Sequence, residues 1–254
     1  MSRALMEIDA LSMRFGGLVA LDAVSFKAVE GAVTAVIGPN GAGKTTLLNC
    51  ISGMYRPTSG QVSFDGHNVT GARPERVARF GMARTFQNLA LFAGLSVLDN
   101  IKVGAYRHGQ SGLLEGALRF GRARREEAET DAAAREVLDF LELGDAATML
   151  PAGLSYGQQK QVEFGRALMQ RARLILLDEP MAGMSAPEKS RMVGLIRRTR
   201  ERFGTSFLLV EHDIPVIMEL SDHVVVLDFG RKIADAPPRE VQADPVVIAA
   251  YLGD

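Results

Sequence analysis

A run of eight residues in the first quarter of the sequence has the composition of a phosphate-binding loop. It reads Gly38-Pro39-Asn40-Gly41-Ala42-Gly43-Lys44-Thr45 and fits the pattern G-x-x-x-x-G-K-[ST]. The glycines allow successive backbone N–H groups to turn inward, and the N-terminus of the predicted helix that follows adds positive charge. We expect Lys44 to reach the β and γ phosphates of a nucleotide and the Thr45 hydroxyl to bind Mg²⁺. The alternative is a glycine-rich turn without a ligand, which does not require every position of the pattern to be filled.

Two adjacent acids, Asp178 and Glu179, follow the apolar residues 174–177, which are expected to form a buried strand. Because neighbouring residues of a strand point to opposite faces, the two carboxyl groups should have different tasks. We assign Asp178 to the magnesium shell and Glu179 to the general base that deprotonates a water aimed at the γ phosphorus. A solvated turn is the alternative. Together with the phosphate loop, the pair predicts hydrolysis of a nucleoside triphosphate.

Short apolar runs recur along the chain and are separated by segments of helical length. The predicted buried strands are residues 33–37, 174–177, 206–210 and 224–227. The predicted helices are residues 44–52, 186–203 and 212–220. This alternation is typical of an α/β fold with a parallel sheet covered by helices. Residues 5–11 and 22–29 alternate loosely, as further strands would.

The composition changes between about residues 89 and 154, where alanine, leucine and charged residues dominate. Within this stretch Ala134, Val137, Leu138 and Leu141 recur at helical spacing, and charged residues fill the opposite face. The segment is therefore predicted to be a helical insertion.

Composition narrows the class of protein. The 254 residues include 29 basic and 30 acidic side chains, and the formal net charge of −1 argues against a nucleic-acid-binding protein. The single cysteine, Cys50, cannot form an internal disulfide and fits a reducing compartment such as the cytoplasm. The apolar runs are far shorter than the ~18 residues needed to span a membrane. The first residues lack the pattern of a signal peptide.

A third motif lies just before the acid strand and carries a family resemblance. Leu154-Ser155-Tyr156-Gly157-Gln158-Gln159 resembles the LSGGQ signature of the ATP-binding-cassette (ABC) ATPases. In that family's order, Gln87 is similar to the Q-loop glutamine, His212 to the switch histidine and Phe15 to the aromatic residue that stacks on adenine. The alternative for His212 is a surface histidine at a helix start.

The resemblance covers essentially the whole chain and implies one ABC ATPase domain over residues 1–254. The implied fold is α/β: a P-loop NTPase (RecA-like) core with a mainly parallel sheet, an N-terminal antiparallel β subdomain and an inserted α-helical subdomain. Residues 1–88 and 159–254 would form the nucleotide-binding core. Residues 89–158 would form the helical signature subdomain.

The resemblance also implies a dimeric mechanism with ATP and Mg²⁺ as cofactors. In ABC ATPases two subunits face each other head to tail, and each ATP lies between the phosphate loop of one and the signature of the other. Ser155 can cap a helix that begins near Tyr156, so Ser155 and the N–H groups around Gly157 would form a second anion site. Gln87 would transmit the state of the γ phosphate to the helical insertion. His212 would sense the γ phosphate and steady the attacking water.

These inferences give a set of candidate site residues. The expected catalytic residues are Glu179 and His212. The expected nucleotide contacts are Phe15, Gly38, Pro39, Asn40, Gly41, Ala42, Gly43, Lys44, Thr45, Thr46, Ser155, Gly157 and Gln158. The expected metal ligands are Thr45, Gln87 and Asp178.

Two residues depart from the family's pattern. Tyr156 stands where the signature usually has its first glycine, and we expect its side chain to point away from the nucleotide. Ser185 stands where the family's D-loop usually has an aspartate, which puts in question how the two ATP sites are coupled.

A closer resemblance is to the G-type ATPase subunit of bacterial importers of branched-chain (hydrophobic) amino acids. It rests on Arg84-Thr85-Phe86-Gln87, Leu91-Phe92, Tyr156-Gly157-Gln158-Gln159, Glu211-His212-Asp213, Ala250-Tyr251-Leu252-Gly253 and a lengthened stretch at about 106–125. It implies a second ABC ATPase, in a homo- or heterodimer, two membrane permease subunits and, indirectly, a periplasmic substrate-binding protein. The expected location is cytoplasmic, peripheral on the inner face of the membrane.

The apolar residues Leu89, Leu91, Phe92, Leu95 and Val97 could form a groove for a permease helix, or they could pack in the core of the helical insertion. Three other functions stay open: an amide or urea importer of the same group, a soluble ABC ATPase that remodels a macromolecule, and a nucleotide-binding regulator without turnover. Glu179 and His212 argue against the last of these.

Overall fold

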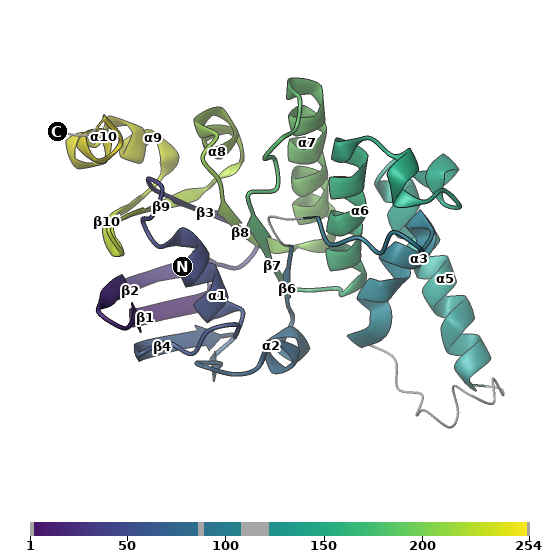
Figure 1. Ribbon diagram of the computed structural model, residues 1–254, viewed down its shortest axis with the longest axis horizontal. Helices are drawn as coiled ribbons and strands as arrows, with labels where there is room; N and C mark the ends of the chain where they lie inside the picture. Colours follow the sequence, from purple (N-terminus) through teal and green to yellow (C-terminus); the bar gives the residue numbers. More distant parts are fainter. Residues whose placement is uncertain (1–2, 86–88, 108–121, 253–254) are drawn as a thin grey trace. The chain divides into compact units, whose positions relative to one another are not determined.

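The computed structural model describes residues 3–85, 89–107 and 122–252. Contacts between residues divide the chain into two compact units, a core unit and a helical unit (Figure 1). The core unit comprises Met1–Arg84, Arg173–Met181 and Ile196–Asp254. The helical unit comprises Thr85–Ala172 and Ala182–Leu195.

An antiparallel sheet in the core unit has the strand order β2-β1-β4-β5. Its strands are β1 (Ala4–Phe15), β2 (Leu18–Val29), β4 (Ser59–Phe64) and β5 (His67–Asn68). The turn between β1 and β2 consists of Gly16 and Gly17, and Gly16 adopts the positive φ of 57° that such two-residue hairpin turns require. Alternate side chains of β1 and β2 are buried, which agrees with the loose alternation in the sequence.

A mainly parallel sheet in the same unit has the strand order β10-β9-β3-β8-β7-β6. Its strands are β3 (Val33–Ile37), β6 (Met82–Arg84), β7 (Leu174–Asp178), β8 (Ser206–Val210), β9 (His223–Asp228) and β10 (Arg231–Ala236). Only β10 pairs antiparallel with its neighbour. Every residue of β3, β7 and β8 is buried, as the continuous apolar runs predicted. The predicted fold class is confirmed.

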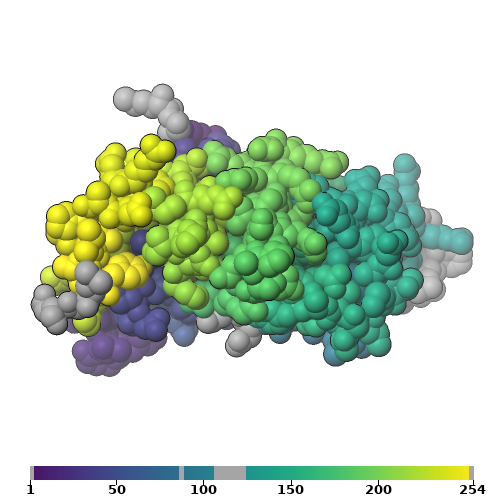
Figure 2. All heavy atoms as spheres, turned by 90° about the horizontal axis from the view of Figure 1, so that it is seen from above, coloured from purple at the N-terminus to yellow at the C-terminus, as the bar shows by residue number. Residues whose placement is uncertain are grey.

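Helices cover the two faces of the parallel sheet in the core unit. They are α1 (Lys44–Ile51), α2 (Pro74–Phe80), α8 (Ile214–Leu220), α9 (Pro238–Ala243) and α10 (Pro245–Leu252). One hydrophobic cluster joins the antiparallel sheet, α1 and one face of the parallel sheet. On the other face, Ile217, Val241 and Val247 from α8, α9 and α10 pack on β3 and β9. In Figure 2 the yellow C-terminal helices lie against the yellow-green residues around α8.

The helical unit is built from short and long helices. They are α3 (Val97–Lys102), η1 (Val103–Arg107), α5 (Arg122–Phe140), η2 (Gly144–Ala146), η3 (Pro151–Gly153) and α6 (Tyr156–Met169), joined by the first part of α7 (Ala186–Phe203). Ala134, Leu138 and Leu141 are buried, so the predicted apolar stripe of α5 faces the interior of this unit. A methyl group on Gly165 of α6 would lie 2.7 Å from Leu141, so α5 and α6 pack closely there.

Some predicted boundaries differ from the structure. The predicted helix 212–220 begins only at Ile214, because Asp213 caps it by accepting a hydrogen bond from the backbone N–H of Val216 at 3.3 Å. Strand β7 ends at Asp178, so Glu179 lies outside it. None of the helices formed by the described residues is both long and apolar enough to cross a bilayer.

Candidate nucleotide-binding site

Three adjacent parallel strands bring the phosphate loop, the acid pair and His212 to one edge of the parallel sheet. In the strand register, Val36 of β3 and Asp178 of β7 both lie beside Val210 of β8. The phosphate loop follows β3 at Gly38, and His212 follows β8 after one intervening residue. The carboxyl edge of a parallel sheet is where α/β proteins bind their ligands. The structure therefore groups three motifs that lie far apart in the sequence.

The phosphate loop is held in a conformation that only glycine fits at two positions. Gly38 and Gly43 have φ values of 151° and 101°. A Cβ on Gly38 would lie 2.1 Å from the carbonyl oxygen of Leu227, and one on Gly43 would lie 2.6 Å from that of Ala20. Gly43 begins α1 without a side-chain cap, and the first turn carries no acidic residue. The first N–H groups of α1 therefore meet the requirement for binding an anion.

Lys44 is a buried cation within this loop. Its Nζ donates hydrogen bonds to the carbonyl oxygens of Gly38 at 2.6 Å and Pro39 at 2.9 Å. Burial lowers the pKa of Lys44, while the nearby charges of Glu179 and Asp178 oppose this shift. The next residue, Thr45, is exposed at the first turn of the helix. Lys44 and Thr45 thus offer an ammonium group and a hydroxyl at the helix N-terminus.

Asp178 is paired with a buried arginine, Arg84, which was not among the candidate site residues. Its Oδ2 accepts a hydrogen bond from the Arg84 guanidinium at 2.9 Å, and both side chains are less than a tenth exposed. The other terminal nitrogen of Arg84 donates to Asn49 Oδ1 on α1 and to Oγ of Ser52, the C-cap of α1, each at 2.7 Å. Arg84 therefore connects Asp178 to the helix that follows the phosphate loop.

Glu179 has a strained backbone. Its φ is +47°, in the left-handed region, which costs a residue other than glycine about 1–3 kcal/mol. Its N–H donates to the carbonyl of Val210 at 2.9 Å, which holds the turn against the end of β8. The expectation that both acids lie on the strand is wrong, because Glu179 is directed by this turn and not by strand alternation. Strain of this kind persists at functional sites.

Glu211 fixes the backbone on both sides of the site. It is 1% exposed, and its Oε1 accepts from the N–H of Met181 at 3.0 Å. Its Oε2 accepts from the N–H groups of His212 at 3.0 Å and Asp213 at 3.4 Å. The side chain of His212 is 64% exposed, with Nδ1 4.0 Å from Glu211 Oε2. A single buried carboxyl group therefore joins the segment after Glu179 to the segment that carries His212.

Two aromatic residues form an exposed pair at the end of β1. Phe15 and Tyr55 pack edge to face with their ring centres 5.4 Å apart. Both rings are more than a third exposed. An exposed aromatic face of this kind can stack on a planar base.

The predicted signature begins α6 in the helical unit. Ser155 is the N-cap and accepts from the N–H of Gln158 at 3.3 Å, while Gln158 Oε1 accepts from the N–H of Ser155 at 2.9 Å. This reciprocal arrangement is a capping box. Tyr156 is 41% exposed and lies beside Gly183, where an added Cβ would be 3.2 Å from its ring. Gln87, the predicted Q-loop residue, lies outside the described residues.

The C-terminal helix also reaches the phosphate loop. Burial raises the pKa of the Tyr251 phenol on α10, and the nearby backbone of Gly38 opposes this shift. Between the loop and α10 lies a cavity of about 530 Å³, lined by Asn40 and Gly41 on one side and by Val246 and Ala250 on the other. This proximity was not predicted, because the ending Ala250-Tyr251-Leu252-Gly253 contributed only to the family resemblance.

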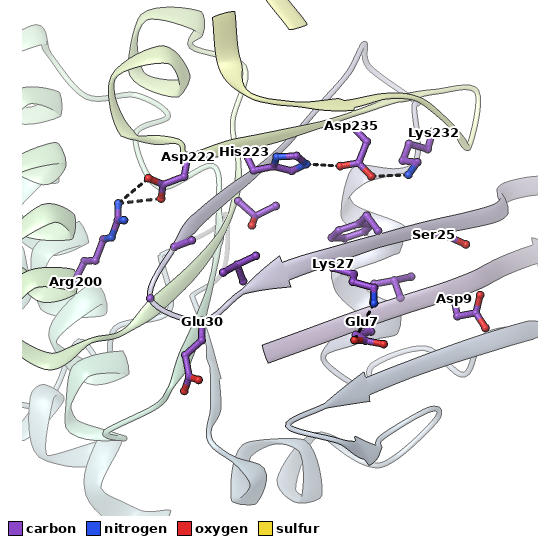
Figure 3. Close-up of a pocket in the computed structure, with 16 residues that line it drawn as sticks. Glu7, Asp9, Ser25, Lys27, Glu30, Arg200, Asp222, His223, Lys232 and Asp235 are labelled. Atoms are coloured by element: carbon purple, nitrogen blue, oxygen red, sulfur yellow. Dashed lines mark hydrogen bonds and ion pairs between the residues drawn. The ribbon is translucent and has the colours of Figure 1, made fainter. Parts of the chain in front are cut away.

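A separate cavity of about 1010 Å³ lies between the antiparallel sheet and the strands β9 and β10. Figure 3 shows the residues that line it. The ion pairs and polar contacts at its walls are Lys27–Glu7, Arg200–Asp222, Lys232–Asp235 and His223–Asp235. Most of its charged groups are thus paired with a neighbour, and none of the residues that line it belongs to the predicted motifs. We therefore place the candidate site at the phosphate loop, although the cavity beside the loop is the smaller of the two.

Comparison with known proteins agrees with the arrangement of these motifs. The sequence model of the family described as "ABC transporter" matches residues 21–182. The chain belongs to this family. Residues 231–254 of the cassette also match the model described as "Branched-chain amino acid ATP-binding cassette transporter".

Two curated relatives resemble this ABC cassette over its full length. It is 40% identical to the high-affinity branched-chain amino acid transport ATP-binding protein BraF of Pseudomonas aeruginosa, and the match covers 100% of each chain. It is 36% identical to the protein of the same description, LivG, of Salmonella typhimurium, again over 100% of each. Its fold matches the crystal structure of the ADP conformation of an ATP-binding cassette from an ABC transporter, with a TM-score of 0.86, 31% identity and 100% coverage of both chains.

Proposed function

We propose that this ABC cassette is the ATP-binding subunit of an importer for branched-chain or other hydrophobic amino acids. The observation that carries the proposal is the meeting of the phosphate loop, the acid pair and His212 at the ends of three adjacent strands. The cassette resembles BraF and LivG over its full length, which supports branched-chain amino acids as the solute. The cassette would work in the cytoplasm, on the inner face of the membrane.

The phosphate loop suits the triphosphate of ATP. The uncapped N-terminus of α1 and the Lys44 ammonium would bind the phosphate oxygens, together with the predicted loop contacts up to Thr46. Phe15 would stack on the adenine. Mg²⁺ prefers oxygen ligands, and the Asp178 carboxylate and the Thr45 hydroxyl supply them. Arg84 bonds to Oδ2 of Asp178, so we assign Oδ1 to the ion. Gln87 is the further predicted ligand. When bound, the ion would neutralise charge on the β and γ phosphates.

Hydrolysis would then depend on the positions of Glu179 and His212. We assign Glu179 to orient the attacking water and accept its proton. We assign His212 to contact the γ phosphate and steady that water. The buried Glu211 binds the backbone of Met181 and of His212, and Glu179 lies in a left-handed turn. These contacts favour fixed positions for the backbone segments that carry Glu179 and His212.

The signature would act on ATP bound by a second cassette. Ser155, Gly157 and Gln158 would meet the γ phosphate from the N-terminus of α6 in a head-to-tail dimer with an identical or a different ABC ATPase. We propose that the helical unit presents this motif within a single ABC ATPase domain. This unit contains the predicted subdomain 89–158 and extends beyond it, to Ala172 and over Ala182–Leu195.

A surface of the helical unit has the character of a docking site for a membrane permease subunit. Phe92 and Leu95 are 50% and 38% exposed, whereas Val97 is fully buried, so only part of the predicted apolar stretch is available at the surface. The loop between Phe92 and Leu95 is held by the buried Asn100. Two permease subunits, and through them a periplasmic substrate-binding protein, are the proposed partners.

The proposal can be tested by purifying the cassette together with its membrane subunits and reconstituting them in lipid vesicles. Leucine and the binding protein should stimulate ATP hydrolysis. Lys44→Ala should abolish ATP binding, and Glu179→Gln should keep binding but stop turnover. Hydrolysis by Glu179→Gln at the wild-type rate would contradict the role of Glu179 as the base. Stimulation by an amide or urea, but not by leucine, would contradict the solute.

A further inference from the structure

The signature of this chain is contacted by a glutamate from its own helical unit. Glu188 lies in the first turn of α7. Its Oε1 accepts hydrogen bonds from Ser155 Oγ at 3.2 Å and from the N–H of Gly157 at 3.1 Å. A Cβ on Gly157 would lie 2.4 Å from the same oxygen, so the carboxylate occupies the space directly over this glycine. A negatively charged group already lies at the N-terminus of α6.

The other oxygen of Glu188 binds the segment before α7. Its Oε2 accepts from the N–H of Ser185 at 2.9 Å and from Ser185 Oγ at 2.7 Å. The bonds from Ser185, with smaller contributions from Gly157 and Ser155, hold the pKa of Glu188 below its usual range. The residue is therefore ionised at neutral pH and behaves as a fixed anion.

These contacts also account for a departure from the family's pattern. An aspartate at position 185, as in the usual D-loop, would place a second negative charge against the Glu188 carboxylate. Serine instead supplies a hydroxyl donor to it. Ser185 and Glu188 thus form one hydrogen-bonded unit with the signature, in which the hydroxyl of Ser185 is a donor.

We propose that Glu188 is an internal ligand of the signature, which the γ phosphate of ATP bound to the partner cassette must displace. This inference rests on the proposed function, because Ser155 and Gly157 are the donors assigned there to that phosphate. On displacement, Oε1 releases Ser155 and Gly157, while Oε2 can keep its bonds to Ser185. The γ phosphate thus competes with Glu188 for the N–H and hydroxyl donors of the signature. Because Glu188 also binds Ser185, its displacement from the signature is connected to this D-loop residue. We classify it as a positioning residue, because it touches the donors and not the ATP.

The test compares Glu188→Gln with the parent in a Glu179→Gln background, in which ATP is not consumed. The assay measures formation of the ATP-bound dimer by size-exclusion chromatography with light scattering. It uses the cassette alone or, where that stays monomeric, mixed with the second cassette of its transporter. Because the neutral amide competes less well for the N-terminus of α6, half-maximal dimerisation should occur at about a tenfold lower ATP concentration. An unchanged or higher ATP concentration would overturn the proposal.

Glu201→Gln is the matched control, since it removes the same charge from an exposed position further along α7 and should leave the ATP dependence unchanged. A second measurement needs neither ATP nor a partner. In the nucleotide-free cassette, the Gly157 amide should exchange with solvent at least several-fold faster in Glu188→Gln than in the parent, as read by NMR. Equal exchange rates would show that the contact does not form.

The two measurements also separate this inference from the function on which it rests. If the Glu179→Gln parent forms no ATP-dependent dimer with itself or with a second cassette, the proposed function fails and the displacement step fails with it. If that parent dimerises but Glu188→Gln does not shift its ATP dependence, only the role of Glu188 is overturned.

Discussion

Arg84 donates a hydrogen bond to the Asp178 carboxylate at 2.9 Å, in a part of the core unit where both side chains are almost fully buried. The same guanidinium contacts Asn49 on α1 and Ser52 at its C-cap. It therefore joins three elements, β6, β7 and α1, beneath the phosphate loop. A buried ion pair of this kind contributes modestly when intact, but removal of one partner leaves an uncompensated charge.

We expect Arg84→Ala to lower the free energy of unfolding by about 3–5 kcal/mol, because Asp178 would stay buried without its partner. Arg84→Lys should cause a smaller loss of stability, because the charge next to Asp178 is kept. It should still destabilise the protein, because lysine cannot reach Asp178, Asn49 and Ser52 at once. Urea unfolding followed by circular dichroism measures both. Arg191→Ala, at an exposed position on α7, is the control and should change stability by less than about 0.5 kcal/mol. A loss for Arg84→Ala no larger than that of the control would contradict this assignment.

At the left-handed turn of Glu179, glycine should be more stabilising than alanine, which reverses their usual order. In most positions glycine is less stabilising than alanine by about 0.5–1 kcal/mol. At φ +47° the Cβ of alanine is unfavourable, so Glu179→Gly should be more stable than Glu179→Ala by about 1 kcal/mol. Both variants lack the carboxyl group, so both should lose ATP hydrolysis. The comparison requires thermal or urea unfolding of the two variants side by side, and a more stable alanine variant would mean that the backbone is not strained there.

Cys50 offers a probe of local opening in α1. It is 1% exposed, and burial raises the pKa of its thiol to about 11. At pH 8 only about a thousandth of the thiol would be ionised, and only the thiolate reacts with disulfide reagents. We expect negligible labelling by a chromogenic disulfide in the folded cassette and rapid labelling in urea. Rapid labelling of the native protein would mean that α1 opens readily next to the phosphate loop.

Asn100 should control the shape of the proposed permease-docking surface. Its Nδ2 donates to the carbonyls of Phe92, Leu95 and Ser96, and its Oδ1 accepts from the N–H of Phe92. Asn100→Leu keeps the volume but satisfies none of these groups, so we expect a loss of about 2 kcal/mol or more in stability. ATP binding at the phosphate loop should be unchanged, while co-purification with the membrane subunits should fall. A variant that is destabilised but still assembles normally would rule out this loop as the docking surface.

Local patterns were sufficient to predict much of the core unit. The phosphate loop lies within eight consecutive residues, and the apolar strands β3, β7 and β8 are continuous runs, so both are visible without tertiary information. The helix at 186–203 was predicted with the bounds that the structure has. By contrast, β6 has only three residues and half of the residues of β10 are charged, so neither gave a strand pattern.

The contacts that position the site could not be predicted from spacing, because they join residues far apart in the chain. Arg84 and Asp178 are 94 positions apart and meet only because β6 lies next to β7. The charge of Glu211 was visible within Glu211-His212-Asp213, but its partner at Met181 is 30 positions away. The turn at Glu179 was missed because a strand pattern does not show where the strand ends. Long-range polar contacts of this kind require the sheet order.

Substitutions of Glu211 should affect catalysis more than folding. Its carboxyl group accepts from the N–H groups of Met181, His212 and Asp213. In Glu211→Gln one acceptor becomes an amide N–H₂, which must face one of these donors, so His212 or the segment after Glu179 has to move. We expect kcat for ATP hydrolysis to fall about tenfold or more, which corresponds to about 1.4 kcal/mol, with little change in KM because Lys44 and the loop are untouched.

Glu240→Gln, an exposed substitution on α9, is the matched control and should leave both constants unchanged. Glu211→Asp tests the geometry separately, because it keeps the charge but draws the carboxyl group back by one methylene, so it cannot reach both segments. It should therefore lower kcat as well, whereas a role in charge alone predicts that it would restore activity. If both variants changed KM and left kcat as in the parent, Glu211 would act on ATP binding, and its proposed function in holding His212 against the γ phosphate would be incorrect.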